Sequence, residues 1–84
     1  MYKAYITISL RKSILDPQGK ATHHALQNLG MKDVSEVRIG KLIELNINAE
    51  NAEKAREVAE TATEKLLANP VMEDYEIEVI EEEQ

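Results

Sequence analysis

Residues 16–19 read Asp16-Pro17-Gln18-Gly19, and they separate a strand pattern from a helix pattern. Two later runs mark similar boundaries: Arg38-Ile39-Gly40-Lys41 and Asn69-Pro70. Asp is a favourable N-cap residue, and Pro at the first helical position lacks an N–H that would have no helical partner there. A helix is therefore predicted to begin at Pro17. Together the three runs divide the chain into strand, helix, strand, strand, helix and strand.

A half-buried strand precedes the first run. Apolar and polar residues alternate from Tyr2 to Leu10, so the even-numbered side chains are predicted to face a core. The helix that follows ends at Gly30, which suits a left-handed C′ position. Gly19 costs about 1 kcal/mol against alanine in helix propensity, which indicates that something other than helix stability selects it. Four apolar residues of this helix are expected to point inward: Ala21, Ala25, Leu26 and Leu29.

The region around the second run allows two interpretations. Alternation on both sides of Gly40-Lys41 favours two strands joined by a tight turn. A single long bent strand from Val34 to Ile47 also keeps the odd positions apolar, except at Lys41. The hairpin is the preferred interpretation.

The second helix has the most regular pattern of the chain. Pro70 keeps Asn69 out of the helical conformation and ends the helix. A last strand follows, and residues 81–84 are predicted to form an acidic, solvated tail. The inward positions of the helix are predicted to be Ala52, Ala55, Ala59, Ala62 and Leu66, with Val58 beside them. One face of the last strand is predicted to carry Tyr75, Ile77 and Val79.

Two strand-helix-strand units predict a single α+β domain over residues 1–84. The expected architecture is a ferredoxin-like β-α-β-β-α-β sandwich, with two helices on one face of a four-stranded antiparallel sheet. The other face would mix polar and apolar residues, as a face that meets another subunit often does. Its residues would be Tyr5, Thr7, Ser9, Arg38, Leu42, Glu44, Glu76 and Ile80.

Composition excludes several classes of function. The net charge of -6 repels nucleic-acid phosphates and anionic membranes, so neither is expected as a partner. Without cysteine there are no disulfides, thiolate metal sites or thiol nucleophiles. No apolar stretch has the length of a signal segment or of a membrane span. We therefore expect a cytoplasmic protein.

No catalytic, cofactor-binding or metal site is predicted. His23 and His24 are adjacent on a helix, so they project about 100° apart and cannot chelate one ion. The glycines lack the spacing of a nucleotide-binding loop. The serines lack a His and Asp arrangement that would activate them: Ser9, Ser13 and Ser35. What remains is an interaction subunit or, as the alternative, a stand-alone effector-binding regulatory domain of ferredoxin-like fold.

Four separated blocks then follow one another along the chain. They are Ser13-Ile14-Leu15-Asp16-Pro17-Gln18-Gly19; Ala25-Leu26 with Leu29-Gly30; Val37-Arg38-Ile39-Gly40-Lys41; and Lys65-Leu66-Leu67-Ala68-Asn69-Pro70-Val71 with Glu73-Asp74-Tyr75. In this order, and over essentially the whole chain, they resemble the PurS family. PurS is the small subunit of phosphoribosylformylglycinamidine synthase.

The resemblance implies a place in purine biosynthesis, in the ATP- and glutamine-dependent conversion of formylglycinamide ribonucleotide to formylglycinamidine ribonucleotide. In this family PurL binds ATP and Mg²⁺ and makes the amidine, and PurQ releases ammonia from glutamine. PurS is then a non-catalytic subunit of this ligase. It is expected to form a homodimer or a higher oligomer and to bring PurL and PurQ together. One departure is Thr63, where some relatives would have cysteine, and it indicates packing and not chemistry.

Within this family, contacts with a partner are predicted at two of the runs. The missing side chain of Gly19 would let another chain approach the helix N-terminus. Arg38 and Lys41 would offer positive charge to an acidic patch of PurL or PurQ, or would pair with Glu36 and Glu44. The predicted contact residues are Asp16, Pro17, Gln18, Gly19, Arg38, Gly40 and Lys41.

Overall fold

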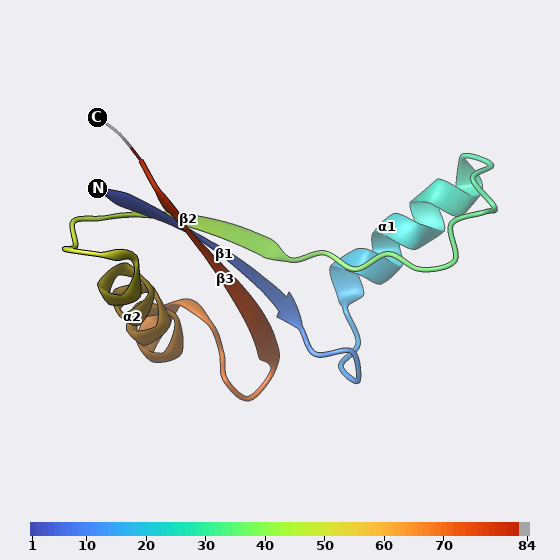
Figure 1. The fold of residues 1–84 in the computed structure, drawn as a ribbon. Helices are drawn as coiled ribbons and strands as arrows, with labels where there is room; N and C mark the ends of the chain where they lie inside the picture. The colour runs from blue at the N-terminus through green and yellow to red at the C-terminus, as the bar shows by residue number, and fades with distance from the viewer. Residues whose placement is uncertain (83–84) are drawn as a thin grey trace.

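The computed structural model describes residues 1–82. Its elements are β1 (Tyr2–Leu10), α1 (Pro17–Asn28), β2 (Lys41–Ile47), α2 (Ala52–Ala62), the π-helical turn η1 (Thr63–Leu67) and β3 (Glu73–Glu81). Figure 1 shows the strands and α2 packed together, with α1 beyond one end of the sheet. The radius of gyration is 16.4 Å, against about 12 Å for a compact domain of this length. The chain is therefore elongated.

The sheet has the strand order β2-β1-β3, and both pairings are antiparallel. At one end Tyr2 pairs with Ile47 and Glu81, and toward the other end Ile8 pairs with Lys41 and Tyr75. The end of β1 therefore lies beside the beginnings of β2 and β3. The alternation predicted for the first strand is confirmed, since Tyr2, Ala4, Ile6 and Ile8 are all buried.

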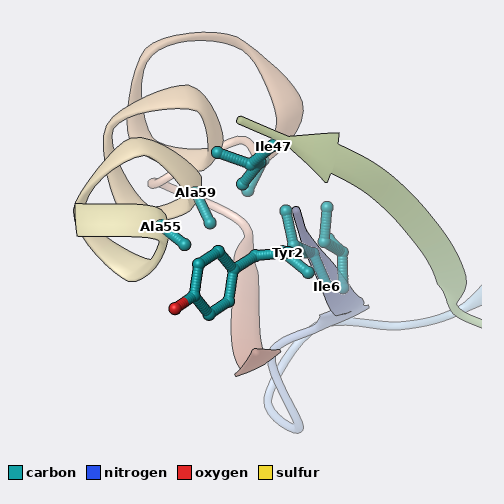
Figure 2. Packing of buried hydrophobic residues seen from close by; sticks show 8 residues of the cluster. Tyr2, Ile6, Ile47, Ala55 and Ala59 are labelled. Atoms are coloured by element: carbon teal, nitrogen blue, oxygen red, sulfur yellow. The ribbon is translucent and has the colours of Figure 1, made fainter. Parts of the chain in front are cut away.

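The core lies between the sheet and α2, as Figure 2 shows. Ala55 and Ala59 are fully buried against the sheet, and their small side chains let the helix approach it closely. Ile6 and Ile8 are the large apolar side chains that are fully buried. Burying a side chain of this size stabilises a fold by about 1.5–3 kcal/mol.

The predicted four-stranded ferredoxin-like sheet is wrong for this chain. Within residues 1–82 the sheet has three strands, and residues 34–40 run into β2 without the expected hairpin (Figure 1). This path is closer to the single long strand, although only Lys41–Ile47 pairs in the sheet. The reason is that backbone groups of residues 34–40 form hydrogen bonds with Asp16 and α1, and not with a neighbouring strand. The Ile39 N–H donates to Asp16 Oδ2 (2.7 Å), and Gln27 Nε2 donates to the Val34 carbonyl (2.9 Å).

The inward stripe predicted for the first helix is also wrong. Ala21, Ala25 and Leu29 are exposed, and Leu26 is only half-buried, because α1 lies beyond the sheet and does not cover it (Figure 1). The predicted end of the helix is confirmed by Gly30, which has φ 91°.

The second face of the sheet carries seven of its eight predicted residues. The strand registers place Tyr5, Thr7 and Ser9 of β1 there, with their neighbours on β2 and β3. Arg38 is the exception, because it precedes β2 and lies outside the sheet.

The last turn of the second helix departs from the predicted pattern. In η1 the Ala68 N–H donates to the Thr63 carbonyl five residues earlier (2.9 Å), and this extra residue in the turn rotates the following side chains. Leu66 is therefore 82% exposed, while Thr63 is fully buried. The Thr63 hydroxyl donates to the Ala59 carbonyl (2.7 Å), which fits the packing role expected of this residue. Ala52, also predicted inward, is exposed.

The predicted acidic tail begins later than expected. β3 continues through Glu81. The next residue, Glu82, has its N–H bonded to the Met1 carbonyl (2.9 Å) and its carboxylate 3.5 Å from Lys3 Nζ. The two remaining residues of the predicted tail, Glu83 and Gln84, lie outside the described residues.

Candidate interaction site where the three runs meet

The three runs that interrupt the sequence pattern meet at one end of the sheet. Because β1 is antiparallel to both neighbours, the segment after β1 lies close to the segments that precede β2 and β3. We call residues 16–19 and 38–41 the junction. Asn69-Pro70 precedes β3 at the same end. The helical residues end just before the predicted stop, at Leu67, and Ala68 is already extended.

Asp16 holds the two halves of the junction together. Its Oδ1 accepts from the Gly19 N–H (3.0 Å), which makes it the predicted N-cap of α1, and its Oδ2 accepts from the Ile39 N–H (2.7 Å). The side chain is buried, with 5% of the residue exposed. The Ile39 and Gly19 N–H groups lower the pKa of Asp16, and the charge of Arg38 adds to this. The carboxylate therefore stays ionised at neutral pH.

The two junction glycines allow backbone segments of the same chain to approach closely. A Cβ at Gly19 would collide with the Val37 carbonyl oxygen and would lie 2.8 Å from Asp16 Oδ2. A Cβ at Gly40 would lie 2.6 Å from the Ile8 carbonyl oxygen. Close packing within the chain thus requires glycine at position 19, despite its low helix propensity. Contact of Gly19 with another chain stays a prediction.

The two basic residues of the junction do not make the predicted alternative ion pairs with Glu36 and Glu44. Arg38 Nη2 donates to the carbonyls of Arg11 (2.9 Å) and Leu10 (3.3 Å) at the end of β1. Lys41 Nζ lies 3.7 Å from a carboxylate oxygen of Glu73. Glu44 instead lies 3.6 Å from Lys3 Nζ.

Two residues outside the predicted contact set connect the junction to Asn69-Pro70. Glu73, which faces Lys41, also accepts from the Asn69 N–H (2.7 Å). Arg11 Nη2 donates to the Pro70 carbonyl (2.6 Å), and Arg11 Nε lies 3.5 Å from Asp74 Oδ1. Neither residue could be recognised in advance, because Glu73 is one of sixteen acidic residues and Arg11 one of ten basic ones.

Five of the seven predicted contact residues line one hollow of about 280 Å³: Asp16, Pro17, Gln18, Gly40 and Lys41. Gly19 is buried, and Arg38 lines a neighbouring hollow of about 170 Å³ together with His23. The polar side chains described above mainly hold backbone groups of their own chain. The outer rim, with exposed Pro17, Gln18 and Lys41, is available for contact.

The two histidines do not share a ligand. His23 Nε2 lies 2.8 Å from the Val34 carbonyl, whereas His24 is exposed. Within residues 1–82, no three His, Cys, Asp or Glu side chains are grouped closely enough to hold a metal ion. None of the described helices is both long and apolar enough to cross a membrane.

These features define a class of protein: a small α+β chain, with one helix packed on a three-stranded sheet and a second helix beyond the end of that sheet. The PurS family model, described as phosphoribosylformylglycinamidine (FGAM) synthase, matches residues 3–81. The chain belongs to the PurS family.

Named relatives span nearly the whole chain. The PurS subunit of phosphoribosylformylglycinamidine synthase from Bacillus subtilis is 48% identical over 81 residues, which are 96% of this chain and 95% of the relative. The corresponding subunit from Methanocaldococcus jannaschii is 47% identical over 79 residues, covering 94% of this chain and 95% of the relative.

Solved structures have the same fold. The crystal structure of Methanocaldococcus jannaschii PurS, one of the subunits of formylglycinamide ribonucleotide amidotransferase, has a TM-score of 0.90 at 47% identity. It covers 99% of this chain and 100% of that chain. A chain in the PurLQS structure from Thermotoga maritima has a TM-score of 0.87 at 38% identity, covering 94% of this chain and 96% of that chain.

Replacing Gly19 by alanine should destabilise the protein. Alanine would gain about 1 kcal/mol of helix propensity, but overpacking against Val37 and Asp16 typically costs about 1–3 kcal/mol, so we expect a net loss. Urea denaturation measures it. Thr22→Ala, at an exposed position of the same helix, is the control and should change stability by less than about 0.5 kcal/mol. A Gly19→Ala protein as stable as wild type would contradict the close approach.

The Asp16 carboxylate should contribute pH-dependent stability. Its pKa is lower in the folded chain than the unfolded value of about 3.9. The contribution is therefore fully present above that value and is lost as the pH falls through the folded pKa. Asp16→Asn removes it, so the stability gap between wild type and variant should be constant near neutral pH and shrink below about pH 4. Urea titrations at fixed protein concentration from pH 7 to pH 3 measure the gap, and a constant gap would contradict this account.

Proposed function

We propose that this chain is a non-catalytic adaptor of phosphoribosylformylglycinamidine synthase, which brings the PurQ glutaminase to the PurL synthetase and supports ammonia transfer between them. The observation that carries the proposal is the match to the PurS family over residues 3–81. The similarity to a chain of the PurLQS structure supports the same role. The family assignment favours this adaptor over a stand-alone effector-binding domain.

The chemistry of the junction supports a role without catalysis. Asp16 and Arg38 bond backbone N–H and carbonyl groups of their own chain, so they are engaged in holding the fold. We therefore assign ATP and Mg²⁺ to the PurL partner, as the family resemblance implies. A cytoplasmic location follows from the same proposal, because the chain would work where purine nucleotides are made.

The rim of the junction is the proposed contact surface for PurL or PurQ. The side chain of Lys41 is 58% exposed although it pairs with Glu73. Glu73 is the more buried partner of this pair, with its side chain 16% exposed. A carboxylate of a partner can therefore approach the exposed side of the Lys41 ammonium without displacing Glu73, while Pro17 and Gln18 add neighbouring contact area.

Self-association into a homodimer or a higher oligomer is part of the proposal. The core is small, since α2 covers only one face of the sheet, and the other face carries exposed Leu42 and Ile80. A second chain that covers this face would remove both apolar side chains from water, which favours association. Light scattering at micromolar concentration should give at least twice the 9.5 kDa mass of one chain, and a monomeric mass would contradict the proposal.

Reconstitution tests the adaptor role directly. Adding the purified chain to PurL and PurQ should restore glutamine-dependent formation of the amidine, because ammonia must pass between the two partners. Ammonia-dependent activity of PurL should depend on the chain much less. Size-exclusion chromatography of the same mixture should show the three proteins together. Glutamine-dependent turnover that is the same with and without the chain would rule out the adaptor role.

A further inference from the structure

The outer side of β3 is a free strand edge. Within residues 1–82, β3 pairs with β1 on one side and with no strand on the other. At one end of this pair the Arg11 N–H donates to the Met72 carbonyl (2.9 Å). At the other end the Glu82 N–H donates to the Met1 carbonyl (2.9 Å). Backbone groups alternate in direction along a strand, so the even-numbered residues of β3 bond β1 and the odd-numbered ones direct their N–H and carbonyl groups outward.

A free edge of this length can pair with another chain. A row of outward N–H and carbonyl groups is a template for strand addition. The residues with outward backbone groups include Tyr75, Ile77 and Val79, whose side chains have high β propensity. Two copies could therefore join through β3 into one continuous sheet, unless other groups prevent it.

Arg56 covers the middle of this edge. It projects from α2, and its Nη2 donates to the carbonyl of Ile77, the central residue of β3 (3.2 Å). An added strand would need this acceptor, and it would lie about 4.8 Å from β3, where the guanidinium now stands. The end of the edge near the junction is closed separately, because the Glu73 N–H donates to the Asn69 carbonyl (2.8 Å).

Acidic side chains oppose the same pairing. Glu76 and Glu78 are exposed on the face of β3 that points away from α2. In a two-fold antiparallel pair centred on Ile77, Glu76 of one copy would lie directly opposite Glu78 of the other. Like charges in that position destabilise a strand pair. The edge therefore carries both an obstacle in its plane and a repulsive charge beside it.

We propose that Arg56, together with Glu76 and Glu78, keeps the β3 edge from pairing with a second copy. Arg56 occupies the central carbonyl, and the two carboxylates repel their counterparts. Self-association is then restricted to other surfaces of the chain. The inference goes beyond the adaptor role and does not depend on it, because it concerns a contact that the chain avoids.

Cysteine cross-linking tests the role of Arg56, because the chain has no cysteine of its own. Glu76→Cys and Glu78→Cys chains of different mass, both also carrying Arg56→Ala, are mixed and oxidised. In an edge pair these positions would have Cα atoms about 4.5 Å apart, within the range of about 4.4–6.8 Å that a disulfide accepts. The yield of mixed disulfide should be at least about fivefold higher than with Arg56 retained, the factor given by one hydrogen bond of typical net strength.

Lys54→Ala in place of Arg56→Ala is the matched control. It removes one positive charge from the same helix, but Lys54 lies 3.6 Å from Glu57 and makes no bond to β3 in the described chain. Its yield should equal that of the cysteine chains with Arg56 retained. Equal yields from the Arg56→Ala and Lys54→Ala mixtures would overturn the role of Arg56.

A second test uses no cysteine and includes the carboxylates. Light scattering over a concentration series compares wild type with a chain that carries Arg56→Ala, Glu76→Gln and Glu78→Gln. The variant should have a larger mass than wild type at the same concentration, with a circular dichroism spectrum that retains the helices, because all three side chains are exposed.

Asp33→Asn with Glu36→Gln is the charge control for this test. Both residues are exposed in the segment between α1 and β2, outside the sheet, so this chain should keep the mass of wild type. A triple variant with the wild-type mass throughout the series would overturn the proposal. Because each mass is compared with that of wild type, the result does not depend on which oligomer wild type forms or on the reconstitution assay.

Discussion

The Asp16 carboxylate is the interaction on which the shape of this chain depends. One oxygen caps α1 and the other binds the Ile39 N–H, so the start of the helix is fixed beside the segment that leads into β2. Gly19 makes the approach sterically possible. The helix and residues 34–40 therefore form one unit beyond the sheet, which leaves the apolar stripe of α1 in solvent and makes the chain elongated.

The same end of the sheet collects the residues that the sequence marks as unusual. Antiparallel pairing brings the end of β1 next to the starts of β2 and β3, and Arg38, Lys41 and Glu73 link these segments through hydrogen bonds and an ion pair. These side chains stabilise a local structure and also shape its outer surface. In our proposal, the exposed rim of this end is the surface that contacts other subunits.

Away from this end, α2 covers one face of the sheet. Ala55 and Ala59 bring α2 close to the sheet, while the π-helical turn directs Leu66 outward, toward a groove of about 730 Å³ along α2. A chain with a small core gains stability when a partner covers its apolar surface, because burial of that surface is the main favourable term in association. Fold stability and self-association are therefore coupled in our proposal.

Local patterns in the sequence determined the strand alternation, the Asp16 and Gly30 boundaries of the first helix and the stop at Asn69-Pro70, because caps and periodicity act between neighbouring residues. The four blocks also identified the family. Only the tertiary structure decided where α1 lies, that residues 34–40 stay outside the sheet, and that Glu73 and Arg11 join the junction. These outcomes depend on which groups, distant in the sequence, form hydrogen bonds with each backbone N–H and carbonyl. The spacing of residues along the sequence does not determine those partners.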